Sequence, residues 1–114
     1  LNPDLIVLAG FLWLIPENII DAFDRKIINI HPALLPKYGG KGMYGMHVHR
    51  AVADNKETES GISVHYVSKE YDAGDLIFQA KCNLSTSDTP EVIANKIHKL
   101  EYDYFPKIIS NLLT

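Results

Sequence analysis

Two short apolar segments near the N-terminus, Leu5–Ala9 and 26–30, limit most strongly what this chain can fold into. Short apolar runs of this kind are typical of strands buried on both faces, usually in a parallel sheet. The segment between them opens with Pro16-Glu17 and predicts a short helix that continues to about Phe23. Strand, helix and strand in this order form a βαβ unit, in which the two strands are parallel and the crossover is right-handed.

The second half of the chain predicts a different arrangement. Met46–Asp54 is expected to be a helix, and Gly61–Ser68 alternates apolar and polar residues as a half-buried strand does. Leu76–Leu84 is expected to be a strand, and the short Asp- and Gly-rich connection before it predicts that the two strands pair antiparallel. A long amphipathic helix follows from Asp88-Thr89-Pro90, and Pro106 is expected to kink or interrupt it. The fold class is therefore α/β.

Composition narrows the class of protein further. The chain has 114 residues, enough for one domain, and a net charge of −3, which argues against nucleic acid as a partner. Its single cysteine, Cys82, cannot form an internal disulfide. We find no run of about 18 apolar residues and no signal peptide, so we expect a cytoplasmic protein with no membrane partner. The chain begins directly with a strand and lacks an initiator Met, so we interpret it as a fragment.

Polar side chains stand out at the end of the second strand. Asn29 and His31 lie two residues apart, so they project to the same face. Ligands of open α/β sheets bind at this end of the strands. Pro32 and Pro36 restrict the backbone that follows. An Asn-x-His pair alone could also be an incidental polar strand end.

The longer sequence around this pair is more specific. Residues 29–38 read Asn-Ile-His-Pro-Ala-Leu-Leu-Pro-Lys-Tyr, and 61–67 read Gly-Ile-Ser-Val-His-Tyr-Val, followed by Tyr71-Asp72-Ala73-Gly74. Together they resemble the signatures of the phosphoribosylglycinamide formyltransferase family, and the resemblance runs nearly end to end. It implies that residues 1–114 form the C-terminal, catalytic and folate-binding part of a Rossmann-like formyltransferase fold. The N-terminal, phosphate-binding half is expected to be absent.

The resemblance also implies an activity. That activity is formyl transfer from 10-formyltetrahydrofolate, as co-substrate, to the amine of glycinamide ribonucleotide in purine biosynthesis, by a monomer or a homodimer and without a metal. Asn29 and His31 would stabilise the oxyanion of the tetrahedral intermediate, where each donor can contribute about 3 kcal/mol. His31 would also act as general acid, and Asp72 would favour its charged form and relay protons. His65 would support Asp72 and its loop, and Ser63, on the same face as His65, would add a hydrogen bond.

The remaining site residues are likewise implied by the resemblance. The expected folate contacts are Leu12, Trp13, Leu14, Ile15, Asn29, Ser68, Lys69, Glu70, Tyr71 and Asp72. The expected contacts to the nucleotide substrate are Gly10, Ile30 and Glu101. The glycine-rich segment Gly39–Gly45 departs from the commoner pattern and could form a longer lid. His47, His49 and His98 are interpreted as surface or helix residues, because a His-x-His pair alone does not make a metal site.

Three other functions are compatible with parts of this pattern. Methionyl-tRNA formyltransferase shares the Asn-x-His and Asp elements, but it usually follows Leu-Leu-Pro with a different sequence and lacks a counterpart of His65. Formyltetrahydrofolate deformylase usually differs after the His, where this chain has Pro32-Ala33-Leu34. A binding module could keep the fold without the reaction, but it would have no need of Asn29, His31 and Asp72 together.

Overall fold

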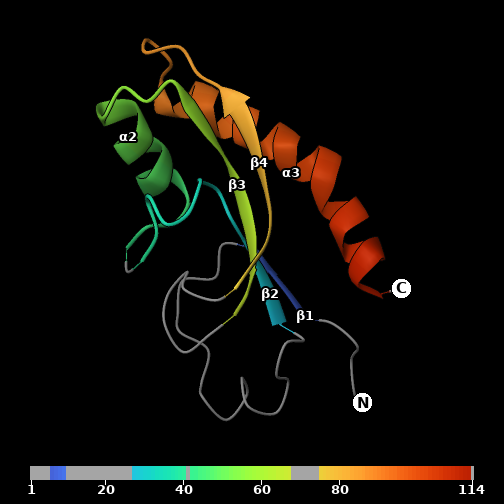
Figure 1. Cartoon of the computed structure of the whole chain (residues 1–114). Coiled ribbons are helices and arrows are strands. Elements are labelled where there is room, and N and C mark those ends of the chain that lie inside the picture. The colour runs from blue at the N-terminus through green and yellow to red at the C-terminus, as the bar shows by residue number, and fades with distance from the viewer. Residues whose placement is uncertain (1–5, 10–26, 41, 68–74, 114) are drawn as a thin grey trace.

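The computed structural model describes residues 6–9, 27–40, 42–67 and 75–113 (Figure 1). Four strands form one sheet in the order in which they occur in the chain: β1 (Ile6–Ala9), β2 (Ile27–His31), β3 (Glu59–Tyr66) and β4 (Leu76–Asn83). Two helices accompany them, α2 (Met46–Asp54) and α3 (Pro90–Leu113). The helix expected between Pro16 and Phe23 lies outside the described residues.

The pairing of the strands confirms the α/β class. β1 and β2 are parallel, and β3 and β4 form an antiparallel pair. β3 also pairs antiparallel with β2, a contact that the sequence did not predict. Because of this contact, the parallel part of the sheet and the hairpin form one continuous surface. β3 begins two residues earlier than expected, since Glu59 and Ser60 pair with Asn83 and Cys82 although neither continues the apolar alternation.

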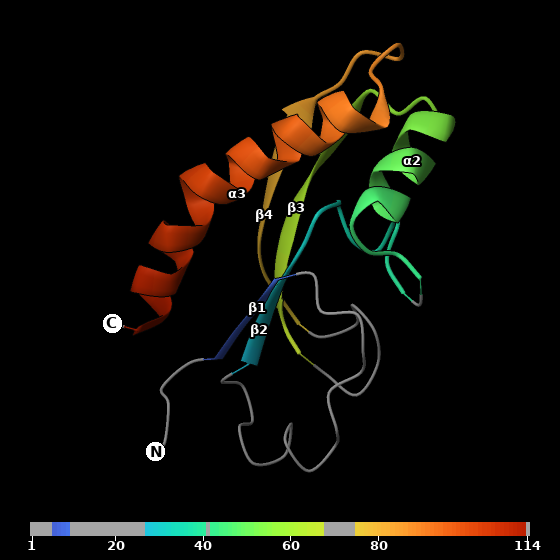
Figure 2. The same cartoon turned by 180° about the vertical axis from the view of Figure 1, so that it is seen from behind.

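One face of the sheet is covered by α3, which runs diagonally across β3 and β4 (Figure 2). The largest side chains that are completely buried come from strands and helix alike, among them Ile28, Ile62, Ile93 and Ile97. Burial of one such side chain contributes about 1.5–3 kcal/mol. α2 packs against α3 and adds Val48 and Val52 to the same core. This apolar layer fixes the position of β2 and β3, which carry the polar residues on their opposite face.

The interruption expected at Pro106 does not occur, because α3 continues from Pro90 to Leu113. A proline at this position cannot donate a hydrogen bond to the carbonyl of Tyr102, four residues earlier. Tyr102 is 87% exposed, so water can satisfy that carbonyl and the helix tolerates the loss. The exposure of this part of α3, rather than the presence of a proline, therefore decides that the helix continues.

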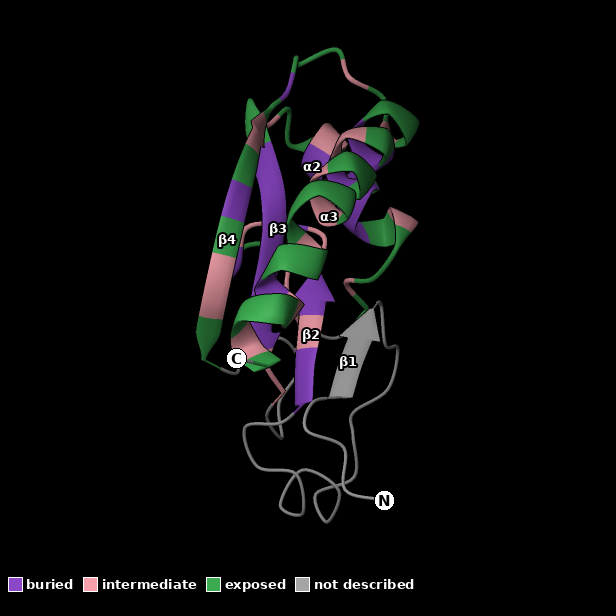
Figure 3. Ribbon diagram, turned by 90° about the vertical axis from the view of Figure 1, so that its right-hand side faces the viewer, coloured by how far each residue is buried: buried purple, intermediate pink, exposed green. Residues whose placement is uncertain are grey.

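Burial differs sharply between the two strands of the hairpin (Figure 3). β3 is buried from Ser60 to His65, because it has a strand on each side. β4 forms the edge of the sheet and is mostly exposed. The loop after β2 lies on the face of β3 that points away from α3, since Ser63 bonds to its backbone and Leu34 lies against Gly61, so Ser63 and His65 are enclosed although they are polar.

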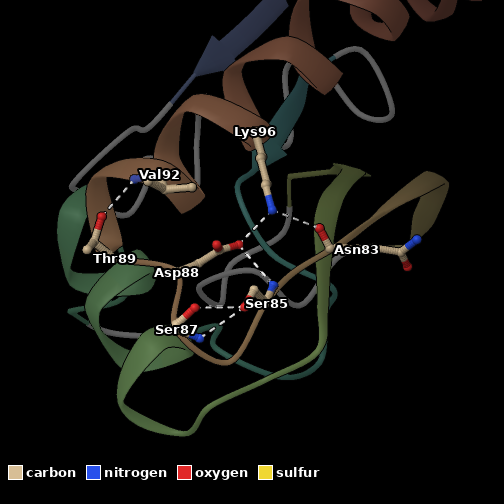
Figure 4. Close-up of polar contacts among 7 residues, drawn as sticks. All are labelled: Asn83, Ser85, Ser87, Asp88, Thr89, Val92 and Lys96. Carbon is tan, nitrogen blue, oxygen red and sulfur yellow. Dashed lines mark hydrogen bonds and ion pairs between the residues drawn. The ribbon is translucent and has the colours of Figure 1, made fainter.

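The start of α3 is tied to the end of β4 by a set of polar contacts (Figure 4). The Nζ of Lys96 lies 2.6 Å from Oδ2 of Asp88 and donates to the carbonyl of Asn83 at 3.2 Å. The same Asp88 oxygen accepts the N–H of Ser85 at 3.0 Å. Thr89 caps the helix, since its hydroxyl accepts the N–H of Val92. These bonds confirm the helix start that the sequence predicted.

Gly61 explains part of the second signature. A Cβ at this position would collide with the carbonyl oxygen of Ala80 and would lie 2.7 Å from Cδ2 of Leu34. Leu34 belongs to the loop that follows β2, so the absence of a side chain at Gly61 lets this loop lie directly on the hairpin.

We expect Gly61→Ala to lower the free energy of unfolding by roughly 2 kcal/mol or more, because the methyl group would overpack a buried site. Chemical denaturation measures the change. Gly42→Ala serves as a control for backbone strain without a clash, since its φ is 83° and no atom lies within 4 Å of the added Cβ, whereas Gly61 has no such φ. A control cost of about 1 kcal/mol is expected. Equal costs for the two variants would show that both the Ala80 carbonyl and Leu34 can move aside.

Asp88 generates a prediction about acid stability. Its hydrogen bonds with Lys96 and Ser85 hold the pKa of its carboxyl below the ordinary value of 3.8. The stabilisation is therefore present above pH 3.8 and is lost as the pH falls through the lower folded-state value. Asp88→Asn should lower the melting temperature at neutral pH by a few degrees, with a gap to wild type that closes in acid. Asp103→Asn, at an exposed position within α3, should leave the melting temperature unchanged at every pH.

Candidate active site

Four polar side chains occupy one face of the β2–β3 pair. In the register of the two strands, Asn29 lies opposite His65 and His31 lies opposite Ser63. Residues two apart on a strand share a face, so the four side chains form a compact block on the side away from α3. His31, Ser63 and His65 are buried, and Asn29 is half-buried. The prediction that Asn29 and His31 share a face is consistent with this register.

Asn29 and His65 contact each other directly. The Nδ2 of Asn29 lies 3.3 Å from Nε2 of His65, and Nδ1 of His65 lies 2.9 Å from the carbonyl oxygen of Tyr66. Because a carbonyl oxygen can only accept, Nδ1 carries the hydrogen and Nε2 accepts from the Asn29 amide. His65 therefore orients the amide of Asn29, with Nδ2 toward the imidazole and Oδ1 away from it.

The Oδ1 atom of Asn29 is buried and has no hydrogen-bond partner in the described part of the chain. A buried polar oxygen without a partner is uncommon in folded proteins and needs an explanation. A substrate N–H group would satisfy it. This atom is the strongest indication that the face is built to hold a ligand.

His31 is held by the loop that follows it. Its Nε2 donates to the main-chain carbonyl of Tyr38 at 2.6 Å. Tyr38 has a φ of 58°, a conformation that residues other than glycine rarely adopt. Sequence reasoning included Tyr38 in the signature but found no role for it, because a main-chain contact leaves no trace in residue type.

The hydroxyl group of Ser63 supports the loop that follows β2, and not the side chain of His65. Its hydroxyl accepts the N–H of Leu35 at 2.9 Å and donates to the carbonyl of Ala33 at 2.7 Å. The side-chain amide of Gln79, on β4, donates to the Ser63 hydroxyl at 2.9 Å and to the Leu35 carbonyl at 3.0 Å. Gln79 was missed in the sequence, and only the register of β3 with β4 reveals that it faces Ser63.

The residues expected to contact the nucleotide substrate differ in where their side chains lie. Ile30 contributes its side chain to the core, so its backbone would have to make the expected substrate contact, which stays a prediction. Glu101 lies on α3 beside a cavity of about 410 Å³ that His98 and Phe105 also line. Burial raises the pKa of its carboxyl, and the charge of His98 partly opposes this rise.

Many of the expected site residues lie outside the described residues: Gly10, Leu12, Trp13, Leu14, Ile15, Ser68, Lys69, Glu70, Tyr71 and Asp72. The convergence of Asp72 with Asn29 and His31 therefore stays a prediction. Within the described residues, no group of three or more His, Cys, Asp or Glu side chains could hold a metal ion. Nor does any described helix have the length and apolar character needed to cross a membrane.

Of the three histidines interpreted as surface or helix residues, His47 and His98 are exposed but His49 is buried, at 3% exposure. Its Nδ1 has no hydrogen-bond partner within the described residues. Burial lowers the pKa of this imidazole, and the charges of His98 and His31 lower it further. The His-x-His spacing concealed this difference, because neighbours two apart on a helix point in different directions.

Comparison with known proteins agrees with the fold and the signatures. The profile described as formyl transferase matches residues 1–109, so the chain belongs to the formyl transferase family. Among its relatives is the chloroplastic phosphoribosylglycinamide formyltransferase of Arabidopsis thaliana, 42% identical over 106 residues, which are 93% of this chain and 36% of that protein. The phosphoribosylglycinamide formyltransferase of Escherichia coli is 37% identical over 108 residues, 95% of this chain and 49% of that protein.

Solved structures give the same result. The phosphoribosylglycinamide formyltransferase of Bacillus halodurans matches with a TM-score of 0.86 and 31% identity, over 97% of this chain and 55% of that chain. A formyltetrahydrofolate deformylase of Pseudomonas syringae matches with a TM-score of 0.79 and 24% identity, over 93% of this chain and 34% of that chain, which shows a shared fold. The chain thus spans about a third to a half of the curated relatives named above.

His49 generates a prediction about pH. Because burial keeps its pKa below the ordinary 6.5, the neutral form is favoured in the folded state. Stability is therefore full above pH 6.5 and falls as the pH drops through the lower folded-state value. His49→Met, which fills a similar volume without a titrating group, should reduce this loss. Thermal melts between pH 7.5 and 5 measure it, with the exposed His47→Gln as control. An unchanged acid sensitivity in His49→Met would place its origin elsewhere.

Proposed function

We propose that this chain carries the formyl-transfer part of a phosphoribosylglycinamide formyltransferase. The reaction moves a formyl group from 10-formyltetrahydrofolate to the amine of glycinamide ribonucleotide in purine biosynthesis. The observation that carries the proposal is the block of Asn29, His31 and His65, in which the buried Oδ1 atom of Asn29 lacks a partner among the described residues. The names of the relatives support the choice of substrates.

The proposed reaction requires hydrogen-bond donors at the carbonyl oxygen of the formyl group. The amine attacks the formyl carbon, and negative charge develops on the former carbonyl oxygen. The Asn29 amide has two N–H groups, and since one is directed to His65, the other can donate to this oxygen. Its Oδ1 can accept an N–H of the attacking amine. His65 fixes the amide in advance, so little reorganisation is needed during the reaction.

Collapse of the intermediate needs a proton. The bond between the formyl carbon and the folate nitrogen breaks, that nitrogen gains a proton, and the attacking nitrogen loses one. In its charged form, His31 acts as the general acid and also stabilises the oxyanion. An unperturbed histidine is mostly neutral at pH 7, so a carboxylate is needed beside it. We assign this role to Asp72, which also relays protons from the amine.

The other expected contacts complete the proposal. Residues 12–15 and 68–72 surround the folate, and Glu101, Gly10 and the backbone of Ile30 contact the nucleotide substrate. Residues 1–114 act as the C-terminal, catalytic portion, and a phosphate-binding portion elsewhere in the protein completes the site. We place the protein in the cytoplasm, as a monomer or homodimer, with no metal cofactor.

We expect Asn29→Ala and His31→Ala, tested in the natural protein that contains this chain, to lower kcat by about 100- to 1000-fold each, because each removes a transition-state donor. Asp72→Ala should act on the same scale. Production of tetrahydrofolate in the presence of glycinamide ribonucleotide measures the rate. His47→Ala, an exposed histidine, is the control. Near-normal turnover in a folded His31→Ala protein would contradict the mechanism.

The same assay separates this function from its rivals. Formyl transfer requires the amine, so tetrahydrofolate should appear only when glycinamide ribonucleotide is added. Release without it would indicate a hydrolase, as in the deformylase of similar fold. Binding of both molecules without any release would indicate a binding module.

A further inference from the structure

We propose that Tyr38 is a positioning residue for His31: its main-chain carbonyl holds the Nε2–H group of the imidazole, and its side chain keeps that carbonyl in place. The inference rests on the proposed role of His31 as general acid. It concerns how the imidazole is oriented before substrate arrives, and it assigns a task to the last residue of the first signature.

The hydrogen bond itself defines the orientation of the ring. His31 is 3% exposed, and its Nε2 lies 2.6 Å from the Tyr38 oxygen, a short distance for an N–H donor. A carbonyl cannot donate, so the hydrogen resides on Nε2 in both the neutral and the charged ring. Proton transfer by His31 therefore uses Nδ1. An oxygen acceptor on Nε2 also favours the charged imidazolium, the form that a general acid needs.

The backbone of Tyr38 is strained at this point. Its φ of 58° is positive, which costs a residue with a side chain roughly 1–2 kcal/mol. Strain of this kind persists only where the surroundings impose it, and it gathers at functional sites. Here the strained residue is the one whose carbonyl meets the buried histidine.

The side chain of Tyr38 helps to hold its backbone in this strained conformation. Its ring packs against the core, and its hydroxyl interacts with the side chains of Asn55 and Glu57, in the segment between α2 and β3. Burial raises the pKa of the hydroxyl, the hydrogen bond from Asn55 lowers it, and the charge of Glu57 raises it. Glu57 also lies 3.5 Å from Nζ of Lys37, so the end of the loop is tied to this segment by two neighbouring residues.

The other end of the loop is fixed independently. Ser63 bonds to the backbone of Ala33 and Leu35, and Gln79 bonds to Leu35. The loop from Ala33 to Tyr38 is therefore held at both ends, and its final carbonyl faces His31 without help from a ligand. Preset orientation of this kind removes the reorganisation that a mobile imidazole would need during the reaction.

The test combines two measurements on the natural protein that contains this chain. Nitrogen-15 NMR of the histidines should show a His31 Nε2–H signal that exchanges slowly with water. Tyr38→Gly keeps the carbonyl and suits the positive φ, but it removes the anchoring side chain. We expect faster exchange of that signal, a kcat lower by roughly 10- to 100-fold, a small change in KM, and an alkaline limb of the pH–rate profile displaced to lower pH.

Two further variants sharpen the test. Tyr38→Phe keeps the ring but loses the contacts with Asn55 and Glu57, so its effect should be intermediate, and it carries the test if Tyr38→Gly does not fold. Tyr44→Gly and Tyr44→Phe are matched controls at an exposed tyrosine whose ring contacts His47. Among the described residues, the titratable groups near His31 include His49, whose charge interacts with it, and His65 on β3, and they are unchanged in every variant.

The two proposals fail in different ways. Slow Nε2–H exchange and an unchanged pH profile in Tyr38→Gly would overturn the positioning role while leaving formyl transfer intact. Faster exchange in Tyr38→Gly, with no formyl transfer by the wild-type protein, would support the positioning of His31 and overturn the proposed function.

Discussion

The antiparallel pairing of β2 with β3 is the interaction on which the rest of the candidate site depends. It places Asn29 against His65 and His31 against Ser63, residues that are more than thirty positions apart in the chain. A shift of one residue in this register would turn the polar side chains of the strand that moved into the apolar layer beneath α3. The isoleucines and valines of the two strands oppose that shift, because it would expose them. The hydrophobic core therefore specifies the geometry of the polar face.

Rigid support of the reacting groups comes mostly from main-chain contacts. The carbonyl of Tyr38 holds His31, the carbonyl of Tyr66 holds His65, and Ser63 holds the backbone of the intervening loop. Backbone groups in a packed loop move less than long side chains, so they can define an orientation closely. The loop in turn reaches the hairpin only because Gly61 has no side chain.

Most of the architecture could be predicted from the sequence, because apolar runs and alternation are local properties. Met46–Asp54 was predicted to the residue, and the hairpin strands to within two residues. The pairing of β2 with β3 could not be predicted from pattern alone, since long-range partners depend on packing. The exposed surroundings of Pro106 and the burial of His49 depend on the same tertiary context. Of the site, Asn29 and His31 were found by their spacing, whereas Tyr38 and Gln79 act through contacts that residue type does not reveal.

The Oδ1 atom of Asn29, which has no hydrogen-bond partner among the residues that the structure describes, has a thermodynamic consequence. A buried acceptor without a partner destabilises the folded chain by about 1–3 kcal/mol relative to one whose bonds are complete. Any molecule that supplies the missing N–H then stabilises the fold as well as filling the site. Under the proposed function, folding and recognition are linked through this single atom, so a substitution that removes the acceptor would stabilise the fold and weaken the binding of the ligand.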